Sequence, residues 1–141
     1  MSHLTDQLRR HEGVETHAYM CPSGYITIGA GRNIDPDGGI GLSESEITFL
    51  LMNDIQRCRD ELEAEYEWFD GLNEARKDVL INMVFNLGAT RFRDFQRAIK
   101  AISEGKWQTA HDEMLDSRWA DQVGDRAKEL AEQMRSGQHL T

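Results

Sequence analysis

The stretch that decides the fold runs from residue 11 to residue 31 and reads HEGVETHAYMCPSGYITIGAG. Gly13 predicts the end of a short helix over residues 3–12, because glycine often follows the last turn of a helix. The Tyr, Ile and Thr residues on either side of Cys-Pro-Ser-Gly favour two strands joined by a turn. The stretch therefore predicts a small β lobe over residues 14–41.

Helical patterns follow the β lobe. Ser43 and Glu46 have the spacing of a capping box, in which each side chain bonds the backbone of the other at the start of a helix. Apolar residues on one helical face then continue for several turns, which predicts a connecting helix over residues 42–66. Further helical patterns punctuated by glycines predict a helical lobe over residues 67–141, packed with the first helix.

Strands followed by a run of helices are typical of the α+β class. We expect a small β lobe, a larger helical lobe and a cleft between them. The length of 141 residues fits a single domain. No apolar stretch approaches the roughly 18 to 20 residues of a membrane span, and the N-terminus lacks the apolar core of a signal peptide. We therefore expect no membrane insertion.

The net charge of −9 argues against nucleic acid as a partner, because phosphate binding usually needs a basic surface. The acids are unevenly spread. Residues 35–75 hold twelve acids and two bases, whereas residues 82–119 hold six bases and five acids. The second segment therefore predicts a less acidic surface.

The two cysteines, Cys21 and Cys58, are too few for a disulfide framework. A single bridge between them stays open as the less favoured alternative. The spacing of cysteines and histidines does not match a zinc site. We expect neither a metal nor another cofactor.

A glutamate, a cysteine and a threonine in the N-terminal stretch have the spacing of a known catalytic motif. Eight residues separate Glu12 from Cys21 and five separate Cys21 from Thr27, which lies in Gly-Tyr-Ile-Thr-Ile-Gly before a Gly-x-Gly. This segment resembles the active site of the phage lysozymes, glycoside hydrolase family twenty-four. The INMVFNLG stretch ending at Gly88 resembles the central helix of that family, and SRW and DRAK near the C-terminus resemble its last helices.

The resemblance implies an endolysin that hydrolyses the β-1,4 bond between N-acetylmuramic acid and N-acetylglucosamine in peptidoglycan and lyses the host cell. Such a reaction needs an acid that protonates the departing oxygen, and the resemblance gives this role to Glu12. Cys21 and Thr27 would hold the water that attacks with inversion. Cys21 stands where an aspartate is more familiar, so it either acts as a base or only places the water.

Two residues outside this segment are also implied by the resemblance. Phe85 would contact the substrate, although its apolar helix also favours a simple core position. Arg126 would pair with Glu12 and orient it. Trp107 and Trp119 favour the core over sugar stacking, because they lie at helical positions.

The partner that the resemblance implies is bacterial peptidoglycan. We expect a monomer that accumulates in the cytoplasm of the host bacterium and reaches the periplasm or cell wall through a membrane lesion made by a separate holin.

Two other functions stay open. A lytic transglycosylase also uses one glutamate, but forms an anhydro product and needs no water. A peptidoglycan-binding module that has lost catalysis would explain the cysteine, but not the intact Glu12 and Thr27.

Overall fold

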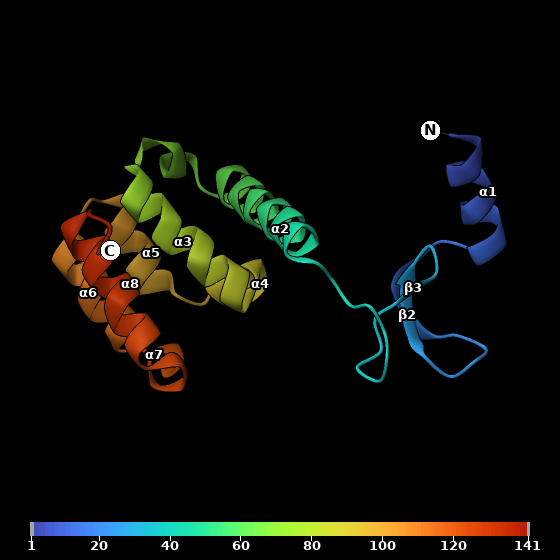
Figure 1. The fold of residues 1–141 in the computed structure, drawn as a ribbon. Coiled ribbons are helices and arrows are strands. Elements are labelled where there is room, and N and C mark those ends of the chain that lie inside the picture. The colour runs from blue at the N-terminus through green and yellow to red at the C-terminus, as the bar shows by residue number, and fades with distance from the viewer. Residues whose placement is uncertain (1, 141) are drawn as a thin grey trace. The chain divides into compact units, whose positions relative to one another are not determined.

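The computed structural model describes residues 2–140, in which a small sheet near the N-terminus precedes a long series of helices (Figure 1). In chain order the elements are α1 (His3–Glu12), β1 (Glu15–Met20), β2 (Ile26–Gly29), β3 (Arg32–Asn33), α2 (Glu44–Glu65), the 3-10 helix η1 (Glu67–Gly71), α3 (Glu74–Leu87), α4 (Ala89–Phe92), α5 (Gln96–Ser103), α6 (Trp107–Leu115), α7 (Arg118–Val123) and α8 (Asp125–Ser136). The predicted α+β class is confirmed. No helix among the described residues is both long enough and apolar enough to cross a membrane.

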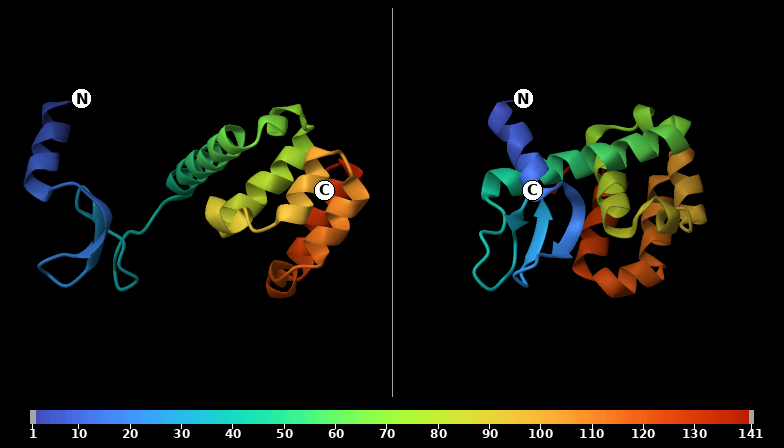
Figure 2. Two further views of the ribbon diagram at one scale, coloured as in Figure 1. Left: turned by 180° about the vertical axis from the view of Figure 1, so that it is seen from behind. Right: turned by 90° about the vertical axis from the view of Figure 1, so that its right-hand side faces the viewer.

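The chain forms two compact units, Met1–Leu50 and Leu51–Thr141, and the division falls inside α2. The first unit contains an antiparallel sheet with the strand order β1-β2-β3 (Figure 2). Thr27 is in its middle strand, paired with Tyr19 on one side and with Asn33 on the other. An irregularity in the register between Glu15 and Tyr19 interrupts β1.

Both helix ends that the sequence predicts in this unit are present. Gly13 follows α1 with φ 77°, and its N–H donates to Arg9 O. At the start of α2, Glu46 N donates to Ser43 Oγ at 3.2 Å, and Ser43 N donates to Glu46 Oε1 at 2.9 Å. The predicted capping box is therefore confirmed, and it satisfies two amide donors at the start of the helix.

The second unit is built around α3. This helix buries side chains on several faces, as expected for a helix that neighbours cover on most sides. Helix α8 packs against both α3 and α6, and α5 packs against α6 (Figure 1). The buried core draws on every helix from the second half of α2 to α8 and includes Cys58, Leu62, Phe69, Val79, Leu80, Ile81, Met83, Val84, Phe92, Ala98, Ala101, Ile102, Ala110, Met114, Trp119, Ala127, Leu130, Ala131 and Met134.

The two tryptophans that the sequence predicts in the core both pack against other side chains of the second unit. Trp119 is 4% exposed, its ring packs edge-on against Phe95, and its indole N–H donates to Asn86 Oδ1 at 2.9 Å. Trp107 is half-buried and lies under the guanidinium of Arg76. The core prediction is thus confirmed for Trp119, and Trp107 packs at the edge of the core with an arginine over its ring.

Arg76 ties the start of α3 to the end of α8. Its Nε donates to Met134 O at 2.8 Å and its Nη2 to Arg135 O at 3.0 Å, while the guanidinium lies 3.8 Å from the centroid of the Trp107 ring. Partial burial lowers the pKa of Arg76.

Gly137 follows α8 with φ 70°, and a Cβ there would lie 2.8 Å from Arg76 Cζ. A glycine is therefore required for both its backbone angle and its lack of a side chain.

Replacing Arg76 by Met should lower the free energy of unfolding by about 2 kcal/mol, because two carbonyls at the end of α8 lose charged donors and Trp107 loses its cation. Urea denaturation followed by circular dichroism measures the change. Arg135→Met is the matched control, since the Arg135 side chain pairs with exposed Glu132 and should contribute less than about 1 kcal/mol. Equal losses in both variants would contradict the proposed tie.

Candidate active site

Glu12 is the last residue of α1, and its side chain lies against the backbone of Gly31. A Cβ at position 31 would lie 2.8 Å from Glu12 Oε2 and 3.0 Å from Glu12 Cδ. Gly31 also has φ 79°, which disfavours any residue with a side chain. The turn between β2 and β3 is therefore shaped to admit the Glu12 carboxylate at close range.

Cys21 and Thr27 are brought together by the turn between β1 and β2. Cys21 N donates to Tyr25 O at 2.9 Å, and Gly24 N donates to Cys21 O at 2.9 Å, which closes the turn. The Tyr25 amide also points at Cys21 Sγ, at 3.4 Å. The hydroxyl of Thr27 is buried and donates to Tyr25 O at 2.9 Å. The backbone of Tyr25 thus bonds both side chains.

The turn also changes the acidity of the thiol. The Tyr25 amide is the main cause that lowers the pKa of Cys21, partial burial opposes it, and the Ser23 and Gly24 amides and the Thr27 hydroxyl lower the pKa further. Amide and hydroxyl donors favour the thiolate because they stabilise its negative charge. Burial instead raises the pKa of the other cysteine, Cys58. Both cysteines are free thiols.

Phe85 lies on α3, and 46% of its surface stays exposed. It lines a groove of about 540 Å³ together with Leu62, Tyr66 and Phe92. Charged residues, among them Arg57, Glu61 and Arg93, line the same groove, so the half-exposed ring of Phe85 borders a mixed surface and is not part of the buried core. The contact of Phe85 with substrate stays a prediction.

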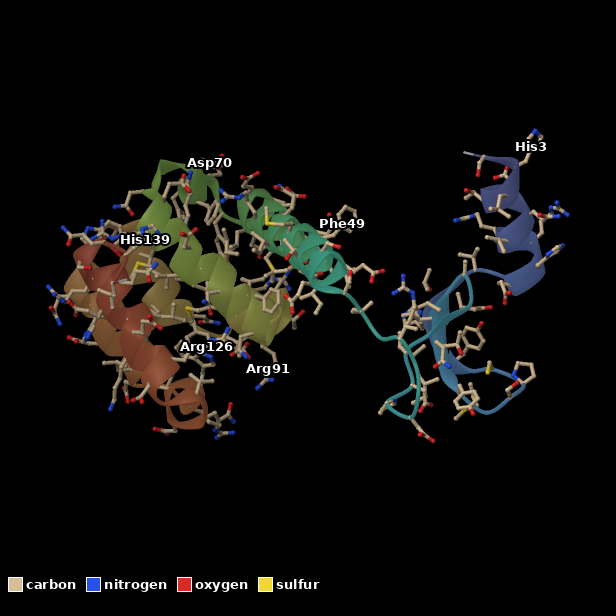
Figure 3. The ribbon with its side chains drawn as sticks, in the orientation of Figure 1. His3, Phe49, Asp70, Arg91, Arg126 and His139 are labelled. Atoms are coloured by element: carbon tan, nitrogen blue, oxygen red, sulfur yellow. The ribbon has the colours of Figure 1, made fainter. Side chains whose placement is uncertain are left out.

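Arg126 lies near the start of α8 (Figure 3). Its Nε and Nη2 both donate to Asn82 Oδ1 on α3, at 3.0 and 2.6 Å. Asn82 therefore orients the guanidinium within the second unit. The predicted pairing of Arg126 with Glu12 stays a prediction.

A second groove of about 560 Å³ has a strongly charged lining. Arg91 on α4 contributes to it (Figure 3), as do Arg97 and Arg118, while Asp94, Glu113 and Asp116 provide acids. The near-balance of bases and acids over residues 82–119 is the signal in the sequence for this surface. Periodicity did not indicate that these residues, from four separate segments, line one groove.

The sequence analysis did not predict a partner for Arg32. It lies in β3 and forms an ion pair with Glu46, the capping-box residue of α2. Among residues 2–140, no group of three or more His, Cys, Asp and Glu side chains is arranged to hold a metal ion.

Comparison with known proteins gives a family for this fold and site. Residues 9–136 match the phage lysozyme family. The chain is similar to a probable T4-type lysozyme 1 of Dictyostelium discoideum, with 27% identity over 97% of this chain and 96% of that protein. It is also similar to the endolysin of Salmonella phage P22, with 27% identity over 77% of this chain and 76% of that one. The pre-baseplate central spike protein Gp5 of Enterobacteria phage T4 is 25% identical over 90% of this chain but only 26% of its own length.

The α+β fold and the match over most of the chain define a glycoside hydrolase of the lysozyme class. The chain belongs to the phage lysozyme family. It is a lysozyme, a hydrolase of peptidoglycan, as the sequence resemblance predicted.

Proposed function

We propose that this lysozyme cleaves the bond between N-acetylmuramic acid and N-acetylglucosamine by inversion, with Glu12 as the general acid and a water held by Cys21 and Thr27. One observation supports the proposal: the β2–β3 hairpin lies next to the proposed acid and also carries a residue proposed to hold the water. Its turn receives the Glu12 carboxylate at Gly31, and its first strand carries Thr27 beside Cys21.

In this single displacement Glu12 gives its proton to the glycosidic oxygen while the bond from that oxygen to the sugar C1 breaks. Positive charge develops on C1, and water attacks C1 from the opposite face. The oxygen of that water becomes the hydroxyl of the new reducing end. The proton that the water loses must pass to a base.

Thr27 and Cys21 divide the work of handling this water. The Thr27 proton is directed to Tyr25 O, so the hydroxyl oxygen is left to accept a hydrogen bond from the water. Cys21 is the base, because the amides of the turn lower its pKa and favour the thiolate that can accept the water proton. An inverting glycosidase needs such a base on the face opposite the acid.

We further propose that the enzyme acts as a monomer, accumulates in the cytoplasm of a bacterial host and reaches the wall after a separate holin opens the membrane. The similarity to endolysins supports this role. Fractionation of expressing bacteria before and after permeabilisation of the membrane tests it. Lysis without permeabilisation would contradict the need for a holin.

Glu12→Gln should lower the rate of release of fragments from purified peptidoglycan by at least about a hundredfold, because the amide cannot supply the proton. Mass spectrometry of the fragments identifies the products. The native enzyme should give free reducing ends, which are one water heavier than anhydro ends. Anhydro ends would instead favour a lytic transglycosylase. Binding without release of fragments by the native protein would favour a catalytically silent module.

Cys21→Ser should lower kcat by about a hundredfold, because a serine hydroxyl does not ionise in the working range and cannot serve as the base. In the native enzyme kcat should rise with pH as the share of Cys21 thiolate grows, as long as the general acid keeps its proton. Cys21→Asp should stay active with that rise moved to lower pH, since a carboxyl ionises near pH 4. A pH profile of kcat measures both effects.

Cys58→Ser is the matched control for the thiol, because Cys58 is buried in the core of the second unit. It should keep the native pH profile of kcat. A Cys21→Ser enzyme with native kcat and pH profile would show that Cys21 is not the base.

A further inference from the structure

We propose that Arg32 and Glu46 form a positioning pair that holds the β2–β3 turn where it receives Glu12. The inference rests on the proposed role of Glu12 as the acid. Neither residue needs to touch the substrate. The pair acts through Gly31, the residue before Arg32 and the one against which the Glu12 carboxylate lies.

The geometry of the pair is specific to an arginine. Arg32 Nη1 donates to Glu46 Oε1 at 2.9 Å and Nη2 donates to Glu46 Oε2 at 2.6 Å, so two parallel bonds join the planar groups. Nη1 also donates to Gly41 O at 2.9 Å. One guanidinium therefore joins β3 to the first turn of α2 and to the loop that leads there. A lysine has no fork that could make all three bonds in this geometry.

Glu46 is held on its other side as well. Its Oε1 accepts the Ser43 amide at 2.9 Å, within the capping box. Arg32 is the main cause that lowers the pKa of Glu46 to about 2, and the amide and hydroxyl of Ser43 add to it. Glu46 is therefore charged throughout the range in which a lysozyme would work, and the pair persists across that range.

Strand β3 needs such support because it is only two residues long. Its backbone pairs with β2 through Asn33 opposite Thr27 and Arg32 opposite Ile28. The side chain of Asn33 and the loop after it support the far end of the strand, where Asp35 N donates to Asn33 Oδ1 at 3.0 Å. The near end runs directly into Gly31. At this near end, the Arg32 side chain bonds Gly41 and Glu46, which lie outside the hairpin.

The arrangement predicts a kinetic effect. If the pair is broken, the turn at Gly31 gains freedom and the Glu12 carboxylate loses its fixed backing. A shift of about 1 Å in a catalytic group is enough to lower a rate by up to about a hundredfold. Because the pair does not bind sugar, the loss should fall on kcat and leave KM nearly unchanged.

The experiment measures kcat and KM on soluble glycan strands, well below the Tm of the least stable variant, for Arg32→Gln, Glu46→Gln and the double variant. Each single variant should lower kcat about tenfold, with KM within about twofold of native. The double variant should be no worse than either single one, since both remove the same pair. Arg32→Lys should recover part of kcat, because it keeps the charge but not the fork.

Arg135→Gln is the matched control. Arg135 makes a forked pair with Glu132 on α8 of comparable exposure, but this pair is not connected to the hairpin. Its kcat should equal that of the native enzyme. As a second readout, the amide resonance of Gly31 should move in Arg32→Gln and in Glu12→Gln, and should stay in place in Arg135→Gln.

The kinetic results test the positioning role and the role of Glu12 separately. Native kcat in Arg32→Gln, additive losses in the double variant, or a loss that appears equally in Arg135→Gln would each overturn the positioning role. Glu12→Gln, measured under the same conditions, distinguishes a failure of the positioning role from a failure of the proposed function. An active Glu12→Gln would mean that the role of Glu12 is wrong, whereas an inactive Glu12→Gln with native kcat in Arg32→Gln would mean that only the positioning pair is wrong.

Discussion

The close packing of the Glu12 side chain on the bare backbone of Gly31 is the contact on which the chemistry proposed for the N-terminal unit depends. With Oε2 only 2.8 Å from where a Cβ at position 31 would stand, the carboxylate can lie there only because Gly31 has no side chain. The contact joins the end of α1 to the turn of a hairpin that also carries Thr27. The short helix and the small sheet bury little apolar surface within their own unit, so this contact at Gly31 is a notable link between them.

A different constraint governs the second unit. Helix α3 buries most of its apolar side chains, so other helices must cover it on several sides. Its first turn is then bonded to the end of α8 by Arg76, by Asn73, whose Nδ2 donates to Gly137 O at 2.9 Å, and by the buried Gln133, whose Nε2 donates to Ala75 O at 2.7 Å. Apolar burial provides most of the stability here, and these polar contacts select one arrangement of α8 on α3.

The turn around Cys21 supports the role proposed for this residue. A thiol is a weaker acid than a carboxyl, and a direct replacement of aspartate would leave a mostly neutral group near neutral pH. The amides of the turn shift Cys21 toward the thiolate, while the Thr27 hydroxyl donates its proton to Tyr25 O. The local backbone thus supplies part of the acidity that the side chain lacks.

The sequence by itself determined the α+β class, the end of α1 at Gly13 and the capping box at Ser43, because caps, turns and periodic patterns depend on neighbours within a few positions. Glu12, Cys21 and Thr27 stay a prediction that rests on the resemblance to the family. It did not indicate η1, the ion pair of Arg32 with Glu46, the hold of Arg76 on α8 or the charged groove around Arg91. The ion pair, the Arg76 contacts and the groove join residues that are far apart in the chain and follow no periodic pattern. The 3-10 helix depends on the packing around it. Only the tertiary structure decided them, since charge pairs and grooves form between whatever side chains the packed elements bring within a few ångströms.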